Sequence, residues 1–273
     1  MTSKSKLFSL NNKVVVITGG TGILGRAIST YLAEEGAKVV ILARNIDLGH
    51  KLVNEIKDKG GEAFFMPTDV LVKEQLNECM NAVFEVYGKV DALLNAAGGN
   101  MPGATISPNA TIFDLEIEAF KNVVDLNLLG TVLPIMVFAE VMAKQQYASI
   151  VNFSSMSALR PLTRVAGYGV AKAAVTNFTK YLAAELAIKF GEGLRVNAIA
   201  PGFFLTEQNR NLLTNSDGSY TERAKKIIAH TPFARFGRPE ELLGTVHYLI
   251  SDASRFVTGT VALVDGGFDA FSI

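Results

Sequence analysis

The sequence predicts a single α/β domain built on a doubly wound, mostly parallel sheet of seven strands with helices on both faces. Three observations support this prediction. Short apolar, β-branched segments alternate along the chain with longer segments of helical periodicity. The apolar segments are nearly continuous, which is typical of strands that helices cover on both faces. A chain of 273 residues, 49% of them hydrophobic, suits one large domain better than two small ones.

The predicted strands and helices follow one another without a linker or an internal repeat. The strand segments are 13–18, 38–43, 62–67, 90–95, 148–153, 195–200 and 261–265. The clearest helical segments are 24–36 and 171–190, and Gly36 suits the end of the first helix. Because parallel strands need crossover connections, this alternation favours a parallel sheet. We expect residues 1–12 to be a flexible lead-in and residues 13–273 to form the domain.

Two longer polar segments, 98–112 and 201–237, interrupt the alternation. Long insertions in a compact α/β domain are usually functional or disordered. Both follow predicted strands, and ligands of such sheets bind beyond the carboxyl ends of the strands. We therefore expect both insertions to border the ligand cleft.

Charge and composition limit the classes of partner. Lys+Arg and Asp+Glu both number 26, so nothing favours nucleic acid or an anionic membrane. The N-terminus lacks the apolar core of a signal peptide, and no run of about 18 apolar residues occurs. The histidines are scattered, and we expect no metal site. These observations predict a soluble, cytoplasmic protein.

A glycine-rich turn, TGGTGILG at 18–25, lies between the first strand and the first helix. Glycine lets the backbone approach a bulky anion, and a helix N-terminus offers free N–H groups. The turn therefore predicts a dinucleotide site, with a purely structural turn as the alternative. Besides Gly25, the residues expected at the cofactor are Gly19, Thr21, Gly22, Ile23 and Leu24.

The end of the second strand bears on the choice between NADP and NAD. An acidic residue there would hold the ribose hydroxyls of NAD, but the sequence has Ala43–Arg44, and Asp47 is too far along. Arg44 could pair with the 2′-phosphate of NADP or stack on adenine. The sequence favours NADP slightly; a solvated arginine beside NAD is the alternative.

The most specific pattern is SSMSALRPLTRVAGYGVAK at 154–172. Tyr168 and Lys172 are four residues apart on a predicted helix, so they share one face. Ser155 lies at the end of the strand 148–153. A hydroxyl, a phenol and an ammonium group are thereby expected to meet over the cleft.

The chain resembles the short-chain dehydrogenase/reductase family over about 250 residues. Its motifs occur in the family's order: TGGTGILG (18–25), TDV (68–70), NAAG (95–98), DLNLLG (125–130), Ser155, YGVAK (168–172), RVNAIAPG (195–202) and VDGG (264–267). The resemblance implies a Rossmann fold and an NAD(P)-dependent oxidoreductase that interconverts a ketone and a secondary alcohol. The glycine spacing departs from the family's usual T-G-x-x-x-G-x-G and is like that of the longer, epimerase-like branch, but this chain is too short for that branch's second domain.

The resemblance implies a catalytic tetrad of Asn127, Ser155, Tyr168 and Lys172. Tyr168 would exchange the proton, with a pKa lowered by the Lys172 ammonium and the nicotinamide charge. Ser155 would position the substrate oxygen, and Lys172 would hold the nicotinamide ribose. Asn127 would hold, through its carbonyl or side chain, a water connected to Lys172.

Further cofactor contacts follow from the same motifs. Besides Tyr168 and Lys172, they are Asp69, Val70, Asn95, Ala96, Gly98, Pro201, Gly202 and Thr206. Helix caps at Asp69 and Thr206 and a core position for Val70 are the alternative interpretations.

The predicted substrate is a sugar acid. The segment after the sixth strand is rich in amides, hydroxyls and arginines, which suits a polyol with a carboxylate. TEQNRNLL and HTPFARFG resemble short-chain reductases of the D-mannonate oxidoreductase (D-fructuronate reductase) type. A reductase of another keto-uronate and a gluconate 5-dehydrogenase are the alternatives. The candidate substrate residues are Asn100, Gln208, Asn209 and Arg210, followed by Arg160 and Arg164.

A nucleotide-sensing protein on the same fold is the competing class, although all four tetrad residues are present. A homo-oligomer, dimer or tetramer, is expected from the resemblance, with a second apolar face of 173–190 as the candidate contact.

Overall fold

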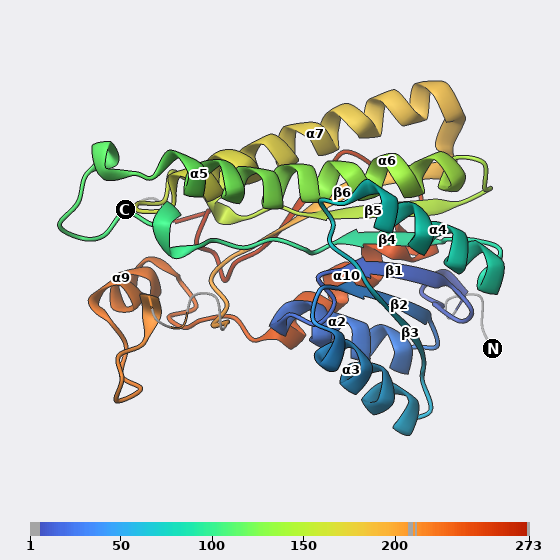
Figure 1. Cartoon of the computed structure of the whole chain (residues 1–273), viewed down its shortest axis with the longest axis horizontal. Helices are drawn as coiled ribbons and strands as arrows, with labels where there is room; N and C mark the ends of the chain where they lie inside the picture. The colour runs from blue at the N-terminus through green and yellow to red at the C-terminus, as the bar shows by residue number, and fades with distance from the viewer. Residues whose placement is uncertain (1–5, 207–209, 211, 272–273) are drawn as a thin grey trace.

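The computed structural model describes residues 6–206, 210 and 212–271, and its strands form one seven-stranded sheet (Figure 1). The strand order is β3-β2-β1-β4-β5-β6-β7, and every pairing is parallel. The strands are β1 (Val14–Thr18), β2 (Lys38–Ala43), β3 (Glu62–Pro67), β4 (Ala92–Asn95), β5 (Ala148–Phe153), β6 (Leu194–Pro201) and β7 (Val261–Val264). Each predicted strand is present, and the doubly wound fold is confirmed.

Helices cover both faces of the sheet (Figure 1). On one face lie α4 (Lys73–Tyr87), α5 (Ile117–Val124), α6 (Gly130–Met142) and α7 (Ala166–Phe190); on the other lie α2 (Ile23–Glu34), α3 (Ile46–Asp58) and α10 (Leu243–Ile250). A further helix, α9 (Glu222–His230), stands apart from both layers, within the second insertion. The helix α7 begins five residues before the predicted 171, which places Tyr168 in its first turn.

The continuous apolar strands are explained by two separate cores. Along β1, Val15 and Ile17 pack with α2, α3 and α10, whereas Val14 and Val16 pack with α4, α6 and α7. All four side chains are fully buried. A central strand therefore has no polar face, which is why its sequence does not alternate.

The segment before β1 is packed against the domain. Leu10 is 1% exposed and belongs to the core cluster of α2, α3 and α10. His247 Nε2 lies 2.6 Å from the Phe8 carbonyl oxygen, and its Nδ1 lies 2.8 Å from the Tyr31 hydroxyl. Because a carbonyl only accepts, Nε2 donates and Nδ1 accepts. Residues 6–12 are thus anchored rather than a flexible lead-in; residues 1–5 lie outside the described residues.

The continuous helical stretch Ile117–Met142 is long and apolar enough to cross a membrane, and within the described ranges it alone is. Half of its most apolar window is buried inside the domain. Its α6 part packs against α4, β4 and β5. The stretch therefore has the surroundings of an interior helix of a globular domain.

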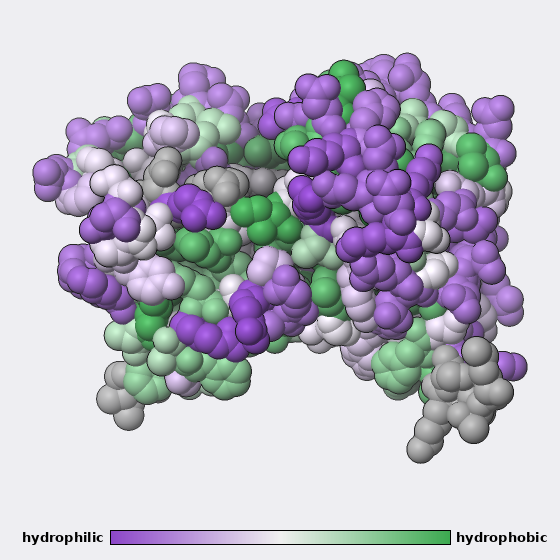
Figure 2. All heavy atoms as spheres, turned by 90° about the horizontal axis from the view of Figure 1, so that it is seen from below, coloured by the Kyte–Doolittle hydropathy of each residue, from purple (hydrophilic) through white to green (hydrophobic). Residues whose placement is uncertain are grey.

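The reversal of strand order between β1 and β4 places the ligand cleft. The chain runs outward from β1 to β3 and then returns to β4 on the other side of β1, and such a switch point leaves a crevice at the carboxyl ends. The Ala97 amide donates to Thr18 Oγ1 across it (3.1 Å). Seen from below, the molecule is hollowed between α9 and the body of the domain, with hydrophobic residues in the hollow (Figure 2).

Candidate active site

The glycine-rich turn has the shape of a phosphate cradle. Gly19 has φ +66°, and a Cβ there would lie 2.7 Å from the Ala97 Cα. A Cβ on Gly25 would lie 2.3 Å from the Gly19 carbonyl oxygen. Gly22 is the N-cap of α2 and provides no side-chain cap, and a Cβ there would meet only the Gly19 carbonyl oxygen, at 3.4 Å. The turn thus leads closely into a helix N-terminus, whose amides suit a pyrophosphate.

The ends of β2 and β3 border the expected adenosine side. Arg44 is exposed directly after β2, and the next residue, Asn45, caps α3 by accepting from the Leu48 amide (3.0 Å). Asp69 Oδ1 accepts from the Leu71 amide (2.9 Å), but the N-cap residue of α4 is Val72, so Asp69 is not the helix cap. Val70 is 6% exposed and lies where a Cβ on Gly130 would contact it, which agrees with a core position.

A cavity of about 550 Å³ lies at the carboxyl ends of β4, β5 and β6. Among the predicted residues, those that line it are Leu24, Ala96, Gly98, Asn100, Ser155, Arg164, Tyr168, Lys172, Pro201, Gly202 and Thr206. The predicted residues outside its lining are Gly19, Thr21, Gly22, Ile23, Gly25, Arg44, Asp69, Val70, Asn95, Asn127, Arg160 and Arg210. Gln208 and Asn209 lie outside the described residues.

Three of the predicted residues that do not line the cavity lie in the sheet or on the surface. Asn95 is fully buried, and its amide donates to Asn152 Oδ1 (2.9 Å), so it joins β4 to β5 beneath the cavity. Arg160 is exposed and forms an ion pair with Asp269 (Nε to Oδ1, 2.8 Å). Arg210 is exposed.

Ser155 and Tyr168 meet as their spacing predicts. Ser155 follows β5, accepts from the Ser157 amide (3.2 Å) and is hydrogen-bonded to the Tyr168 side chain. Burial raises the pKa of Tyr168, and the bond with Ser155 lowers it by less. Burial therefore disfavours the phenolate, and the expected lowering by the Lys172 ammonium and the nicotinamide charge stays a prediction.

Lys172 lies one helical turn beyond Tyr168 and is 3% exposed. Its Nζ donates to the Phe153 carbonyl oxygen (2.7 Å) and lies 5.6 Å from the centre of the Tyr168 ring. Burial lowers the pKa of Lys172 to about 8. Two of its three ammonium protons remain for other acceptors.

Asn127 lies in a π-helical turn (Asp125–Leu129) between α5 and α6, not in a regular helix. Its Nδ2 donates to the carbonyl oxygens of Gly99 (2.6 Å) and Val123 (2.8 Å), and its Oδ1 accepts from the Gly99 amide (3.1 Å). The side chain is thus occupied in holding the segment after β4. Both Nδ2 protons are thereby used, whereas Oδ1 and the backbone carbonyl oxygen, which accepts from Thr131 (2.9 Å), each accept one bond and can accept another from a water.

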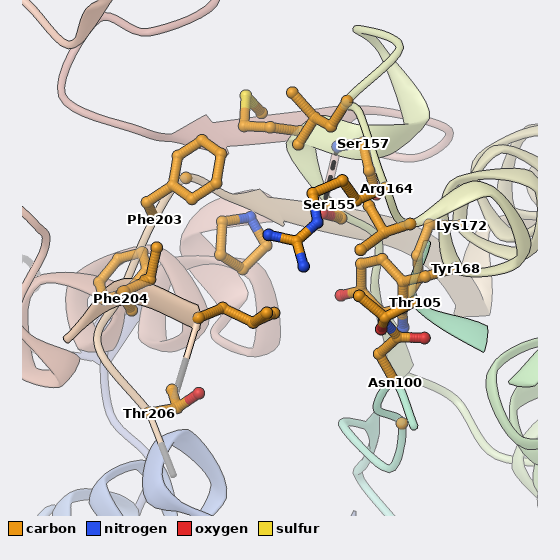
Figure 3. Close-up of a pocket in the computed structure, with 18 of the residues that line it drawn as sticks. Asn100, Thr105, Ser155, Ser157, Arg164, Tyr168, Lys172, Phe203, Phe204 and Thr206 are labelled. Atoms are coloured by element: carbon orange, nitrogen blue, oxygen red, sulfur yellow. Dashed lines mark hydrogen bonds between the residues drawn. The ribbon is translucent and has the colours of Figure 1, made fainter. Parts of the chain in front are cut away.

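Five further polar residues that line the cavity were not predicted: Thr105, Ser107, Ser154, Ser157 and Arg223. Figure 3 shows the Arg164 guanidinium in the middle of the cavity, with Tyr168, Thr105 and Asn100 on one side and Phe203 and Phe204 on the other. For Thr105, Ser107 and Arg223, the only indication in the sequence was the polar character of the two insertions. Within the described part of the chain, no group of three or more His, Cys, Asp and Glu side chains is placed to hold a metal ion.

The fold and this cavity define a nicotinamide-dependent oxidoreductase of the Rossmann type, and comparison with known proteins agrees. Residues 21–269 match the family model adh_short_C2, described as enoyl-(acyl carrier protein) reductase. The chain belongs to the short-chain dehydrogenase/reductase family and is an NAD(P)-dependent oxidoreductase.

One related protein and two solved structures show which oxidoreductases the chain is similar to. An uncharacterized oxidoreductase of Bacillus subtilis, UxuB, is 44% identical over 97% of both chains. A crystal structure with bound NAD, of a protein proposed to be a D-mannonate oxidoreductase of Haemophilus influenzae, is 42% identical, with a TM-score of 0.89 over 97% of both chains. A gluconate 5-dehydrogenase of Burkholderia cenocepacia, in complex with NADP and tartrate, is 29% identical, with a TM-score of 0.87 over 98% of this chain and 99% of that one.

Proposed function

We propose that this enzyme interconverts a keto group and a secondary alcohol on a sugar acid of the D-mannonate/D-fructuronate type. The observation that best supports a polyhydroxylated substrate is a pair of buried polar atoms without a hydrogen-bond partner, Asn100 Oδ1 and Ser157 Oγ. Both residues line the cavity that contains Tyr168. Buried polar atoms are costly when unpaired, so hydroxyl groups of a substrate would stabilise them.

The orientation of the Asn100 amide follows from its neighbours. Its Nδ2 lies 2.7 Å from Thr105 Oγ1, and the Thr105 hydroxyl donates to the Met101 carbonyl oxygen (3.2 Å). Because that hydroxyl has given its proton to Met101, it accepts from the amide nitrogen of Asn100. The carboxamide oxygen of Asn100 is therefore free to accept a bond from a substrate hydroxyl.

The proposed roles of the tetrad follow from the geometry of the cavity. When bound, NAD(P) supplies or accepts the hydride. Tyr168 would give its proton to the keto oxygen in reduction, and Ser155, already hydrogen-bonded to Tyr168, would hold that oxygen. Lys172, fixed by the Phe153 carbonyl, would use its remaining protons on ribose hydroxyls, and its charge would favour the phenolate. Asn127 would act by fixing the segment after β4.

A keto-uronate reductase of other specificity and a gluconate 5-dehydrogenase are alternatives within the same reaction class. The likeness to the Burkholderia gluconate 5-dehydrogenase supports the second. A panel of uronates and aldonates, assayed with NAD(H) and NADP(H), tests the proposal: we expect the highest kcat/KM on D-fructuronate or D-mannonate. Uniform turnover of simple ketones would contradict a sugar-acid function, and absence of any nicotinamide oxidation or reduction would favour the nucleotide-sensing alternative.

We also propose that Arg44 favours NADP by pairing with its 2′-phosphate, since no carboxylate occupies the end of β2. Arg44→Gln is expected to weaken NADPH binding about 10-fold, the loss of a charge-assisted bond, and to leave NADH binding unchanged. Fluorescence titration of both cofactors measures this. Lys51→Gln, at an exposed position on α3, is the matched control. Equal weakening of both cofactors would refute the assignment.

A homo-oligomer is proposed on the basis of exposed apolar side chains on α6 and α7. Met136, Tyr181 and Ile188 are 56%, 58% and 82% exposed. Side chains of this size are buried when helices of two subunits pair.

A further inference from the structure

The segment 98–112 holds Arg164 in an unusual conformation. Arg164 has φ +76°, in the left-handed region that side-chain-bearing residues rarely adopt. The Ile106 amide donates to its carbonyl oxygen (3.0 Å), and Arg164 Nε donates to the Ile106 carbonyl oxygen (2.7 Å). Residue 106 thus fixes both the backbone and the guanidinium of Arg164, and the side chain points into the cavity (Figure 3). Strained residues held in this way are frequent at ligand sites.

The second insertion brings another guanidinium to the same place. Arg223, in the first turn of α9, donates through NH1 to Thr163 Oγ1 and through NH2 to the Thr163 carbonyl oxygen, both at 3.0 Å. Thr163 is followed directly in the chain by Arg164. Burial and the positive charge of Arg164 lower the pKa of Arg223. Two like charges are therefore held close enough to repel each other.

No negative charge of the described chain offsets this pair. Neither guanidinium forms an ion pair with a described carboxylate, and no described Asp or Glu lines the cavity. After the bonds given above, Arg164 keeps four N–H donors and Arg223 three. An outer hollow of about 340 Å³ shares both arginines with the cavity and adds Lys226 and His230 to its wall, again without a described Asp or Glu. An anion is the partner that this arrangement lacks.

We propose that Arg164 and Arg223 together bind the carboxylate of the substrate, at the boundary between the cavity and the outer hollow. Planar guanidinium groups match a carboxylate with paired hydrogen bonds. The inference rests on the proposed function and adds to it: the fixed position of the carboxylate determines which carbon of the chain reaches Tyr168. It also gives the 98–112 insertion a role, which is to hold Arg164.

The test uses two ketoses that differ only in the charged group, D-fructuronate and D-fructose. Arg164→Gln and Arg223→Gln are each expected to lower kcat/KM for D-fructuronate about 10- to 100-fold and to change it for D-fructose less than about 3-fold. Arg164→Gly is the second variant, because glycine adopts a positive φ without strain and so keeps the fold. Arg164→Gly should show the same selective loss of kcat/KM for D-fructuronate over D-fructose. Arg160→Gln, which removes an arginine paired outside the cavity, should change neither substrate.

Equal losses on both ketoses, or no loss on either, would contradict the proposal that Arg164 and Arg223 bind the substrate carboxylate. Preference for D-fructose 6-phosphate over D-fructuronate, dependent on the same arginines, would also overturn it, because it would assign the pair to a phosphate. Calorimetric titration of D-mannonate and D-mannitol into the wild-type protein tests the carboxylate site independently of the proposed reaction. If no substrate is turned over but D-mannonate binds and Arg164→Gln abolishes that binding, the carboxylate site is supported and the proposed reaction is contradicted.

Discussion

Replacing Tyr168 with phenylalanine is expected to lower kcat/KM by about 10²- to 10⁴-fold, the range that a positioned general acid contributes. The substitution removes one hydroxyl and keeps the ring that lies beside Lys172. Ser155 loses its hydrogen-bond partner, but no other side chain has to move. NAD(P)H should therefore bind with nearly unchanged affinity, which fluorescence titration can measure alongside steady-state kinetics.

The matched control is Tyr181→Phe, which makes the same change on an exposed face of the same helix, α7. It should leave turnover unchanged. If Tyr168→Phe keeps more than about a tenth of wild-type activity, Tyr168 is not the proton donor. Loss of cofactor binding together with turnover would instead indicate that the cavity had collapsed.

The sequence was sufficient to predict the meeting of Ser155, Tyr168 and Lys172, because each position follows from a local rule. Ser155 ends a strand whose length its apolar run defines. Tyr168 and Lys172 share a helical face because they are four residues apart, although the helix begins earlier than its periodicity indicated. The carboxyl ends of parallel strands then meet at one edge of the sheet.

The glycine-rich turn shows what a sequence pattern leaves out. Its spacing, with glycine at Gly22 and Gly25, departs from the pattern usual in the family. In the structure, Gly22 precedes the first residue of α2, and Gly25 lies in the first turn, against the Gly19 carbonyl. Residue 25 must lack a side chain because the backbone of the turn, at Gly19, contacts the helix there. The spacing of glycines in the sequence does not reveal this contact.

The features that the sequence did not predict depend on tertiary contacts. Arg223 reaches the cavity only because α9 docks beside Thr163, 60 residues away in the chain. The π-helical turn at Asn127 has no recognised local signature, and it brings the side chain to Gly99. Burial of Tyr168 is also a tertiary effect, and it opposes the lowering of the pKa that is expected from the nearby charges.

Lys172→Met is expected to lower kcat/KM by about 10²-fold or more, since it removes the ammonium group that is proposed to hold ribose and favour the phenolate. The wild-type enzyme should show a related loss with pH. Because burial lowers the pKa of Lys172 to about 8, its charge disappears as the pH rises through that value. NAD(P)H affinity should fall over the same range, and in Lys172→Met it should be weak at every pH.

Stability should change in the opposite direction, which distinguishes this titration from general alkaline unfolding. Between pH 8 and the ordinary pKa of lysine, 10.5, the unfolded chain holds a proton that folded Lys172 has released. The free energy of unfolding therefore rises with pH in this window, by up to about 3 kcal/mol at its upper end. Urea unfolding between pH 7.5 and 9.5 lies below the titration of unfolded tyrosines, and the buried Cys79 thiol, whose pKa is raised, lowers stability with pH equally in both proteins. The slope of stability against pH should therefore be more positive in the wild type than in Lys172→Met. The same slope in both proteins would mean that Lys172 is not the group that titrates, and the loss of cofactor affinity above pH 8 would then need another source.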